Sequence, residues 1–553
     1  MKLSGAQIVI ECLNAQEVEA IFGFPGGAVI PLYDALYDAK YPMKHYRTCH
    51  EQGAVHAADG YARTTGKVGV CIVTSGPGAT NTITGIATAY MDSVPLVIIT
   101  GQVGRPLLGR DSFQEVDITA MTLTITKHCE MVKTASQIES TLMRAFEIAR
   151  SGRPGPVLID IPKDIMTQVV EYRGEVMKPN AVHQELDHEA IQVAIEALKN
   201  AKNPVILAGG GVSHASAGDV LKEFAIRSNI PVVNTLMGSG AFPQSHHLSY
   251  GLIGMHGSVV ANSCLSNSDV ILAIGARFSD RVIGASEKFC SGAKIIQIDI
   301  DINEVGKNKE IMYPIVGDLG KVLSIFSEKL DGFRWKSRSD AGKKSDVDHK
   351  AKQMLSAIRQ TFGDEAIVVT EVGQHQMWTA QYYGFEKTRK FITSGGLGTM
   401  GFGLGAAIGS QIGNPEQTVV HIAGDGSFKM NSNELGTVSK YNIPIKTFIF
   451  NNNALGMVRQ WQRMFCESRF SETDGDDSVD FVKLAEAYGI DGYRVSTQEE
   501  LEAVLKIIKN IKRPVVVDCI IDHDENVYPI IPPGKGITEM VTAFETTKRE
   551  VSL

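Results

Sequence analysis

An aspartate flanked by two glycines stands where an apolar run of the sequence stops. The run "TVVHIA" leads directly into Gly424, Asp425 and Gly426. Glycines let the backbone turn tightly and approach a ligand, and a carboxylate offers oxygen to a hard cation such as Mg²⁺. Helix N-termini at the ends of parallel strands also present free N–H groups to anions. The stretch therefore predicts a metal and phosphate site, with a glycine turn or helix cap as the plainer interpretation.

Three asparagines follow the next apolar run, "IPIKTFIF". They occupy positions 451–453, and Asn452 lies 27 positions after Asp425. If the two runs are neighbouring parallel strands, both polar ends lie at one edge of the sheet. An amide oxygen would then join the carboxylate, with phosphate and water completing the octahedron around Mg²⁺. The two motifs together are more specific than either alone.

The elements that must position these residues alternate short β-branched runs with longer helical patterns, which is typical of α/β sheets. The runs are apolar on both faces, so we expect central parallel strands covered by helices. Residues 166–190 and the charged stretch 336–350 indicate linkers. We expect three doubly wound parallel-sheet domains at 1–165, 191–335 and 361–535, with 536–553 as a C-terminal tail. The strand-like runs are 68–75, 95–101, 156–162, 204–210, 269–276, 294–301, 418–425, 445–452 and 514–521.

Composition excludes several classes of protein. The chain has 553 residues, 43% of them hydrophobic, and a net charge of -8, so it lacks the basic excess that nucleic-acid binding needs. No apolar run approaches the roughly 18 residues that span a membrane. Eight cysteines without a C-x-x-C pair predict small buried residues in a reducing compartment rather than disulfides or zinc ligands. With Ser4 as a helix N-cap and no signal-peptide pattern, we expect a cytoplasmic protein.

The stretch "GDGSFKMNSNELGTVSKYNIPIKTFIFNNN" resembles the thiamin-diphosphate (ThDP) binding motif, in which GDG is followed about thirty residues later by NN. The resemblance implies that Mg²⁺ is held by Asp425, Asn452 and the carbonyl of Ala454. Because three asparagines are consecutive, Asn451 or Asn453 could take the place of Asn452. The resemblance further assigns cofactor contacts to Gly373, Gln374, His375, Gly426, Ser427 and Met457.

ThDP chemistry requires an acid beside the aminopyrimidine, and a buried, protonated glutamate suits that task. Glu51 follows the strand-like "KHYRT" and matches the H-E-x-x-A helix of the family. Its plainer interpretation is a solvated first-turn glutamate. In relatives this glutamate and the GDG site come from different subunits, which implies a dimer. The resemblance also gives Gly27 close approach to the cofactor ring and makes Met400 an apolar wedge, although methionine usually fills a core.

The whole chain resembles the large catalytic subunit of acetohydroxyacid (acetolactate) synthases. This resemblance implies that pyruvate is decarboxylated on ThDP and that the two-carbon unit joins pyruvate or 2-ketobutyrate. The products would be 2-acetolactate or 2-aceto-2-hydroxybutyrate, precursors of branched-chain amino acids. Phe113, Gln114 and Lys163 would lie near the reaction centre, although Lys163 also suits a helix first turn after Pro162.

The acceptor keeps its carboxylate, which an arginine binds best. "GARFSDRVIG" matches the family pattern R-F-D-D-R with Ser279 in place of the first aspartate, so Arg281 is the expected carboxylate ligand. A surface Arg–Asp pair is the alternative. Trp461 occupies the position where the family uses tryptophan to favour 2-ketobutyrate over pyruvate, a contact of about one methylene worth about 1–3 kcal/mol. The alternative is a core residue, because an indole in an amphipathic helix is usually buried in the core.

The middle block contains "PVILAGGGVSHA", which lacks the last glycine of G-x-G-x-x-G and is weak evidence for a dinucleotide. The resemblance implies FAD here, with a structural role because carboligation needs no net electron transfer. His256 has no companion metal ligands in the sequence. The FAD contacts carried over are Arg153, Gly209, Gly210, Gly211, Thr235, Leu236, Met255, His256, Gly257, Arg277, Asp299, Ile300 and Asp318.

Three alternatives stay open at this point. One is another ThDP enzyme, such as pyruvate oxidase or glyoxylate carboligase, the latter typically without the glutamate present here as Glu51. The second is a flavin-free catabolic acetolactate synthase, which Arg277 and Arg281 disfavour. The third is a nucleotide-binding or scaffold protein that has lost its chemistry. Family members form dimers or dimers of dimers and commonly bind a small regulatory subunit.

Overall fold

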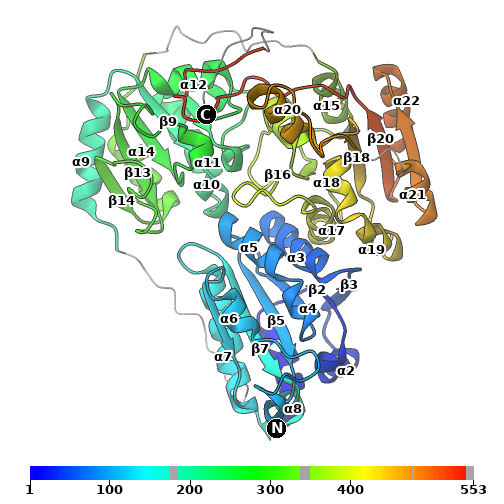
Figure 1. Cartoon of the computed structure of the whole chain (residues 1–553). Coiled ribbons are helices and arrows are strands. Elements are labelled where there is room, and N and C mark those ends of the chain that lie inside the picture. Colours follow the sequence, from blue (N-terminus) through cyan, green and yellow to red (C-terminus); the bar gives the residue numbers. More distant parts are fainter. Residues whose placement is uncertain (173, 175–184, 337–348, 476–478, 544–553) are drawn as a thin grey trace.

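The computed structural model describes residues 1–172, 174, 185–336, 349–475 and 479–543. Within this part of the chain, three six-stranded parallel sheets follow one another, each covered by helices (Figure 1). This confirms the predicted fold class. We call each sheet with its helices the N-terminal, central or C-terminal unit. Most of the predicted linkers (173, 175–184 and 337–348) and the end of the tail (544–553) lie outside the described residues.

Ser4 caps the first helix of the N-terminal unit, as the sequence predicts, and Gln7 completes a capping box with it. A two-stranded antiparallel pair joins β1 (Lys2–Ser4) to β8 (Val169–Glu171). The sheet has the order β3 (Lys44–Arg47), β2 (Ala20–Phe24), β4 (Gly69–Val73), β5 (Leu96–Gln102), β7 (Pro156–Pro162) and β6 (His128–Met131). The helices are α1 (Gly5–Ala15), α2 (Ile30–Asp38), α3 (Glu51–Thr65), α4 (Pro77–Thr80), α5 (Ile83–Asp92), α6 (Ile118–Thr122), α7 (Ile138–Arg150) and α8 (Lys163–Thr167).

The central unit repeats this architecture. Its sheet has the order β11 (Ser249–Leu252), β10 (Val232–Asn234), β9 (Pro204–Ala208), β12 (Val270–Ile274), β13 (Lys294–Asp299) and β14 (Tyr313–Val316). The helices are α9 (His188–Lys199), α10 (Gly211–His214), α11 (Gly218–Ser228), α12 (Val259–Ser266), α13 (Asp280–Ile283) and α14 (Leu319–Lys329).

The C-terminal unit contains both motifs from which the sequence predicts a metal site. Its sheet has the order β16 (Phe391–Ile392), β15 (Ile367–Thr370), β17 (Val419–Gly424), β18 (Lys446–Asn451), β20 (Val515–Ile520) and β19 (Asp491–Val495). The helices are α15 (Lys350–Phe362), α16 (Gln374–Tyr382), α17 (Gly403–Gly413), α18 (Asp425–Lys429), α19 (Leu435–Lys440), α20 (Gly456–Phe465), α21 (Phe481–Ala487) and α22 (Gln498–Ile508).

The N-terminal and C-terminal units meet along α3 and α17, which lie side by side (Figure 1). A Cβ atom built on Gly60 would lie 2.0 Å from the carbonyl oxygen of Ala406, and one on Gly409 would lie 1.7 Å from that of Ala57. Glycine is therefore required on both helices for this close approach. The contact fixes α3, and with it Glu51, against the C-terminal unit of the same chain.

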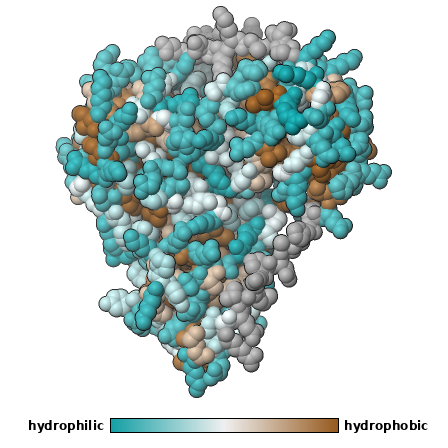
Figure 2. All heavy atoms as spheres, turned by 180° about the vertical axis from the view of Figure 1, so that it is seen from behind, coloured by the Kyte–Doolittle hydropathy of each residue, from teal (hydrophilic) through white to brown (hydrophobic). Residues whose placement is uncertain are grey.

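The surface and the cysteines bear on the compositional predictions. Seen from behind, apolar side chains form small patches separated by hydrophilic ones (Figure 2). No described helix has both the length and the apolar content needed to cross a membrane. None of the eight cysteines, all within the described residues, forms a disulfide bond. Five are buried as predicted, whereas Cys49 is exposed and Cys129 and Cys466 are half-buried, so the prediction of burial is wrong for these three.

Candidate functional site

The predicted metal residues lie at one edge of the C-terminal sheet. Asp425 begins α18 directly after β17, and the neighbouring β18 ends at Asn451 with Gly424 opposite Phe450. The sequence prediction of neighbouring strands is thus confirmed. Asp425 is only 3% exposed, and burial raises the pKa of its carboxyl to about 6. A bound cation would stabilise the charged carboxylate there.

The three consecutive asparagines have different partners. Asn451 donates from Nδ2 to Asp518 (2.9 Å) and accepts the N–H of Asn453 at Oδ1 (3.1 Å), so both ends of its amide are used. Asn452 donates from Nδ2 to Oε1 of Gln374 (3.1 Å), which leaves its own Oδ1 for another partner. This pattern favours Asn452 over Asn451 as the oxygen ligand.

The Ala454 backbone has the geometry of a short antiparallel bridge with Asp474. The hydrogen bonds of this bridge use the carbonyl of Asn453 and the N–H of Leu455, not the carbonyl of Ala454. That carbonyl can therefore serve a cation. Among the described residues no cluster of three or more His, Cys, Asp or Glu could hold a metal. One carboxylate, one amide and one carbonyl form the hard oxygen set that Mg²⁺ prefers.

Two helix N-termini open at the same edge. Gly373 precedes α16 with a φ of 154°, and Gly424 precedes α18, and neither helix start has a side-chain cap. Because β15 and β17 are neighbours, the uncapped N–H groups lie near each other and suit an anion. The Gln374 amide donates to the carbonyl of Glu525 (2.7 Å) and so links the start of α16 to the segment after β20. Burial lowers the pKa of His375 to about 4, which leaves its ring neutral.

Met400 lies in the turn between β16 and α17, half-buried, beside an exposed stretch at 396–398. Asp92, the last residue of α5, accepts the N–H groups of Gly395 (3.1 Å) and Gly396 (2.7 Å). The N-terminal unit therefore holds one end of this turn. Met457 is half-buried on α20 and packs against the core of the C-terminal unit.

Glu51 is the first residue of α3, but the prediction that it is buried is wrong for this single chain. Its side chain is half-buried, and its carboxylate accepts a hydrogen bond from Asn81 (2.9 Å). Gln114 packs against Gly76, where a Cβ atom would lie 2.8 Å from that of Gln114. Gly78, two residues further on, borders Glu51. The turn 74–81 thus brings Glu51 and Gln114 together, in support of their predicted roles.

Other predicted reaction-centre residues lie at the surface. Phe113 is 87% exposed, and Lys163 is exposed at the start of α8. Gly27 starts a short 3-10 turn with open space around its Cα atom. The side chain of Arg281 is 62% exposed, with Asp280 at 3.6 Å, which is the surface Arg–Asp pair weighed as the alternative. Among the described residues, no hydrogen bond or ion pair joins these four to the Asp425 cluster.

Trp461 does not belong to a core. It is half-buried on α20, where its ring lies 5.3 Å from that of Phe465, and the buried residue of this helix is Gln460. The plainer interpretation of a core indole is therefore wrong, and the indole can contact a ligand.

The residues assigned to FAD lie at the carboxyl edge of the central sheet. The glycine turn is explained in part by packing, because a Cβ atom on Gly209 would lie 2.1 Å from the carbonyl oxygen of Gly275. Gly209, Gly210 and Gly211 follow β9, Thr235 and Leu236 follow β10, Met255, His256 and Gly257 follow β11, Arg277 follows β12, Asp299 ends β13 and Ile300 follows it, and Asp318 follows β14.

Two of these arginines lie where the N-terminal and central units meet. Arg153 donates to Ser93 (2.8 Å) and to Glu304 (2.7 Å), and Arg277 donates to the carbonyl of Met91 (2.6 Å). Burial lowers the pKa of His256 to about 4, so it is a neutral buried side chain. The predicted FAD contacts thus share one sheet edge and the adjoining seam between units.

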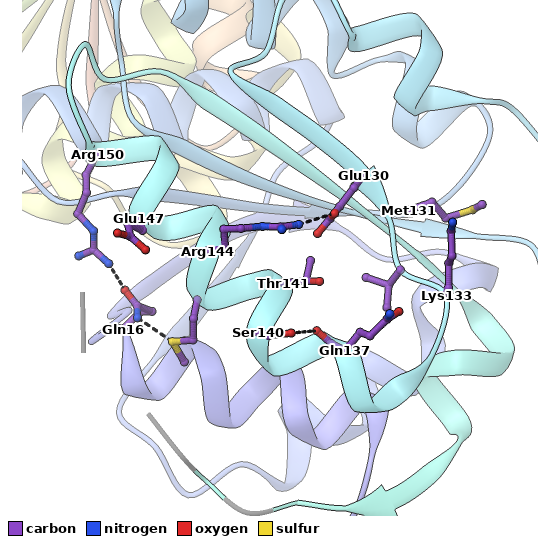
Figure 3. Close-up of a pocket in the computed structure, with 12 residues that line it drawn as sticks. Gln16, Glu130, Met131, Lys133, Gln137, Ser140, Thr141, Arg144, Glu147 and Arg150 are labelled. Carbon is purple, nitrogen blue, oxygen red and sulfur yellow. Dashed lines mark hydrogen bonds and ion pairs between the residues drawn. The ribbon is translucent and has the colours of Figure 1, made fainter. Parts of the chain in front are cut away.

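A cavity of about 530 Å³ lies elsewhere, between α7 and β6 on the N-terminal unit (Figure 3). Arg144 pairs with Glu130 across it, and Gln16 accepts from Arg150. None of the described residues that line it is a predicted site residue.

Sequence reasoning missed several residues that hold the site in place. Asn81 was visible only as part of the glycine-rich "TSGPGATN", and Asp92 is the last residue of an ordinary helix. Glu371 lies within the run "AIVVTEV", one residue before its end, and gave no separate signal. Their roles depend on contacts with distant segments, which a local pattern does not reveal.

Three parallel sheets in one chain, with glycine turns at the strand ends and a buried Asp425 beside Asn452, suit a thiamine pyrophosphate enzyme. Three family descriptions match: the thiamine pyrophosphate enzyme N-terminal TPP binding domain over residues 3–121, the central domain over 191–325 and the C-terminal TPP binding domain over 371–519. The chain is 43% identical to the acetolactate synthase isozyme 2 large subunit of Escherichia coli, covering 98% of this chain and 99% of that protein.

Two further relatives agree. The acetolactate synthase large subunit of Haemophilus influenzae is 44% identical over 98% of both chains. That of Lactococcus lactis is 42% identical over 99% of this chain and 97% of its own. The chain belongs to the acetolactate synthase family of thiamine pyrophosphate enzymes.

Proposed function

We propose that this chain is an acetohydroxyacid synthase catalytic subunit. It would decarboxylate pyruvate and join the two-carbon unit to pyruvate or 2-ketobutyrate, giving 2-acetolactate or 2-aceto-2-hydroxybutyrate. The observation that carries the proposal is the buried Asp425 beside Asn452 and two uncapped helix N-termini, in a chain whose relatives are acetolactate synthases over nearly their full length.

The residues fit ThDP and Mg²⁺. Asp425, Oδ1 of Asn452 and the carbonyl of Ala454 would hold the metal, and the N–H groups at the starts of α16 and α18 would bind the diphosphate. When bound, ThDP supplies an electron sink for decarboxylation. Glu51 would hold a proton at the pyrimidine ring. Arg281 would bind the acceptor carboxylate, and Trp461 would contact its alkyl group.

We further propose that the active site is completed by a second copy of the chain. Glu51 and Gln114 are only half-buried in the single chain, and Phe113 is almost fully exposed. Contiguous exposed apolar surface marks interaction sites. Large apolar side chains also stand exposed on the segments around the Asp425 cluster, namely Leu397, Met430, Leu455 and Val458. These features support a homodimer, or a dimer of dimers, with Glu51 and Asp425 from different subunits.

FAD and the unit boundaries are part of the same proposal. The strand ends of the central sheet and the seam at Arg153 and Arg277 would hold the flavin in a structural role. The domains would run over 1–165, 191–335 and 361–535, consistent with the three matched ranges. Eight cysteines without a disulfide bond among them support a reducing compartment such as the cytoplasm. A small regulatory subunit is a further proposed partner.

The test is product analysis with purified protein. Pyruvate alone should give 2-acetolactate only with ThDP and Mg²⁺ present, and pyruvate with 2-ketobutyrate should give both products. A yellow protein whose flavin keeps its oxidised spectrum during turnover agrees with the proposal. Flavin reduction at the catalytic rate would instead identify an oxidase, and a colourless active protein would identify a flavin-free synthase. No product under any of these conditions would contradict the proposal.

A further inference from the structure

Glu371 holds the turn that carries Met400. It lies directly after β15 and is 0% exposed. Its carboxylate accepts the N–H of Gly401 at Oε2 (2.9 Å) and the N–H of Leu404 at Oε1 (3.1 Å). Met400 therefore stands immediately before a backbone segment that one buried side chain fixes at two points.

The same carboxylate reaches the turn after β17. The hydroxyl of Ser427 donates to Oε2 of Glu371 (2.8 Å) and accepts from the N–H of Gly401 (3.1 Å). Ser427 is itself buried. Because its hydroxyl proton is given to Glu371, Ser427 can offer a diphosphate its backbone N–H rather than its O–H. Glu371 thus joins the Met400 turn to the start of α18.

Glu371 carries its charge within the core. Burial alone would raise the pKa of Glu371, but His421 and the hydrogen bonds from Ser427 and the backbone outweigh it and hold the pKa below its ordinary value. Nε2 of His421 lies 3.6 Å from Oε1, and His421 is also fully buried. Hydrogen bonds to a charged acceptor are stronger than neutral ones. An anion that accepts three donors from two segments is a rigid joint between them.

We propose that Glu371 is a positioning residue that sets the Met400 side chain and the N–H groups at the start of α18 in register for the bent ThDP molecule. The inference rests on the proposed function. A positioning role differs from a purely structural one in its effect on the cofactor. Substitution of Glu371 should weaken ThDP binding more than the same substitution of another buried glutamate in the C-terminal unit.

Glu434 provides the matched control. It is also 0% exposed, and its carboxylate accepts the N–H groups of Cys49 (3.1 Å) and His50 (2.9 Å) and the hydroxyl of Thr437 (2.5 Å). It thus has the same kind and number of donors as Glu371 but faces the start of α3. Glu434→Gln should perturb folding in a similar way without disturbing the diphosphate residues.

The experiment titrates apoprotein with ThDP, and separately with inorganic pyrophosphate, in excess Mg²⁺ by calorimetry. Glu371→Gln places an amide N–H₂ against a hydrogen-bond donor, so we expect ThDP to bind at least about tenfold more weakly. Pyrophosphate should lose less affinity than ThDP, because Met400 is not expected to contact it. Glu434→Gln should leave pyrophosphate affinity unchanged. Equal ThDP affinity in wild type and Glu371→Gln would overturn the inference, as would equal pyrophosphate losses in both variants.

A second measurement applies if Glu371→Gln does not fold. Ser427→Ala removes the hydroxyl but keeps the N–H, so it should weaken ThDP binding only about two- to fivefold. A loss of about 100-fold would mean that the hydroxyl binds the diphosphate directly, which contradicts the proposed joint. Wild-type protein that fails to bind ThDP would instead refute the proposed function, so the two failures can be told apart.

Discussion

The two halves of the candidate site are built differently. The cofactor half, around Asp425 and Asn452, is buried and linked by hydrogen bonds within one unit. The reaction half, around Glu51, Phe113 and Arg281, is half-buried or exposed. The groups expected to bind the cofactor are therefore preorganised in the single chain. The groups expected to act on the substrate are not, and under the proposed function a second copy of the chain would cover them. Preorganisation of this kind reduces the cost of binding a cofactor.

The largest expected effect is in the cofactor half. Asp425→Asn should abolish measurable synthesis of 2-acetolactate and weaken Mg²⁺-dependent ThDP binding by more than about 100-fold, because an amide cannot replace the anionic metal ligand. The apoprotein should unfold at no lower temperature, since the variant removes a carboxylate whose pKa burial raises to about 6. Calorimetry and thermal scans measure both. Near-normal metal dependence would show that the cofactor half is misassigned.

The reaction half should respond in the opposite way. Glu51→Gln should lower turnover by about 100- to 10,000-fold while ThDP affinity changes little, because proton transfer and not anchoring is lost. Steady-state rates and a ThDP titration separate the two quantities. Asn81→Ala, which removes the hydrogen-bond donor to Glu51, is the milder companion variant. If Glu51→Gln lost ThDP affinity as strongly as Asp425→Asn does, the contrast between the halves would not hold.

Arg281 should give an intermediate effect that depends on the substrate. Arg281→Ala should lower kcat/KM for the acceptor by about 10- to 100-fold, since a charged hydrogen-bonded contact is lost, while release of CO₂ from pyruvate falls less. Comparison of acetohydroxyacid formation with CO₂ release measures this. Lys288→Ala, which removes an exposed cation elsewhere in the central unit, is the control. Equal loss of both activities would refute the assignment.

The smallest expected effect concerns stability. Burial raises the pKa of Asp160 to about 7, although Thr100 and Gln102 donate to it. The folded state then binds more protons than the unfolded state between about pH 4 and 7, so the free energy of unfolding should fall as pH rises through that window. Asp160→Asn should remove this slope in urea titrations.

Asp164, on the following helix, is the opposite control. Hydrogen bonds and charge from Arg105 outweigh burial and lower its pKa, so its contribution to stability is present above the unfolded pKa and is lost as pH falls. Asp164→Asn should therefore remove a slope of the reverse sign. The same slope in both variants would contradict the assignment for Asp160.

Much of the fold could be predicted because its central strands are apolar on both faces. All nine strand-like runs form interior strands, from β4 to β20. Edge strands such as β6 and β19 lack this pattern, since their residues are mostly half-buried and include charged side chains. Asp425 and Asn452 could be paired from sequence because each follows an apolar run, and such runs become neighbouring strands.

The remainder of the site could not be predicted for two physical reasons. Glu371 acts through Gly401, Leu404 and Ser427, which lie 30, 33 and 56 positions away, so no local pattern reveals it. How far the Glu51 side chain is buried depends on which segments or subunits pack against α3, and this cannot be predicted from one sequence.

The most direct test of the split site mixes two inactive variants. Glu51→Gln and Asp425→Asn subunits should exchange into hybrid dimers in which one site combines an intact Glu51 with an intact Asp425 from the other chain. Random mixing of equal amounts then predicts recovery of about one quarter of wild-type activity. A mixture that forms hybrid dimers, shown by a mass difference between the subunits, and yet remains inactive would contradict the account.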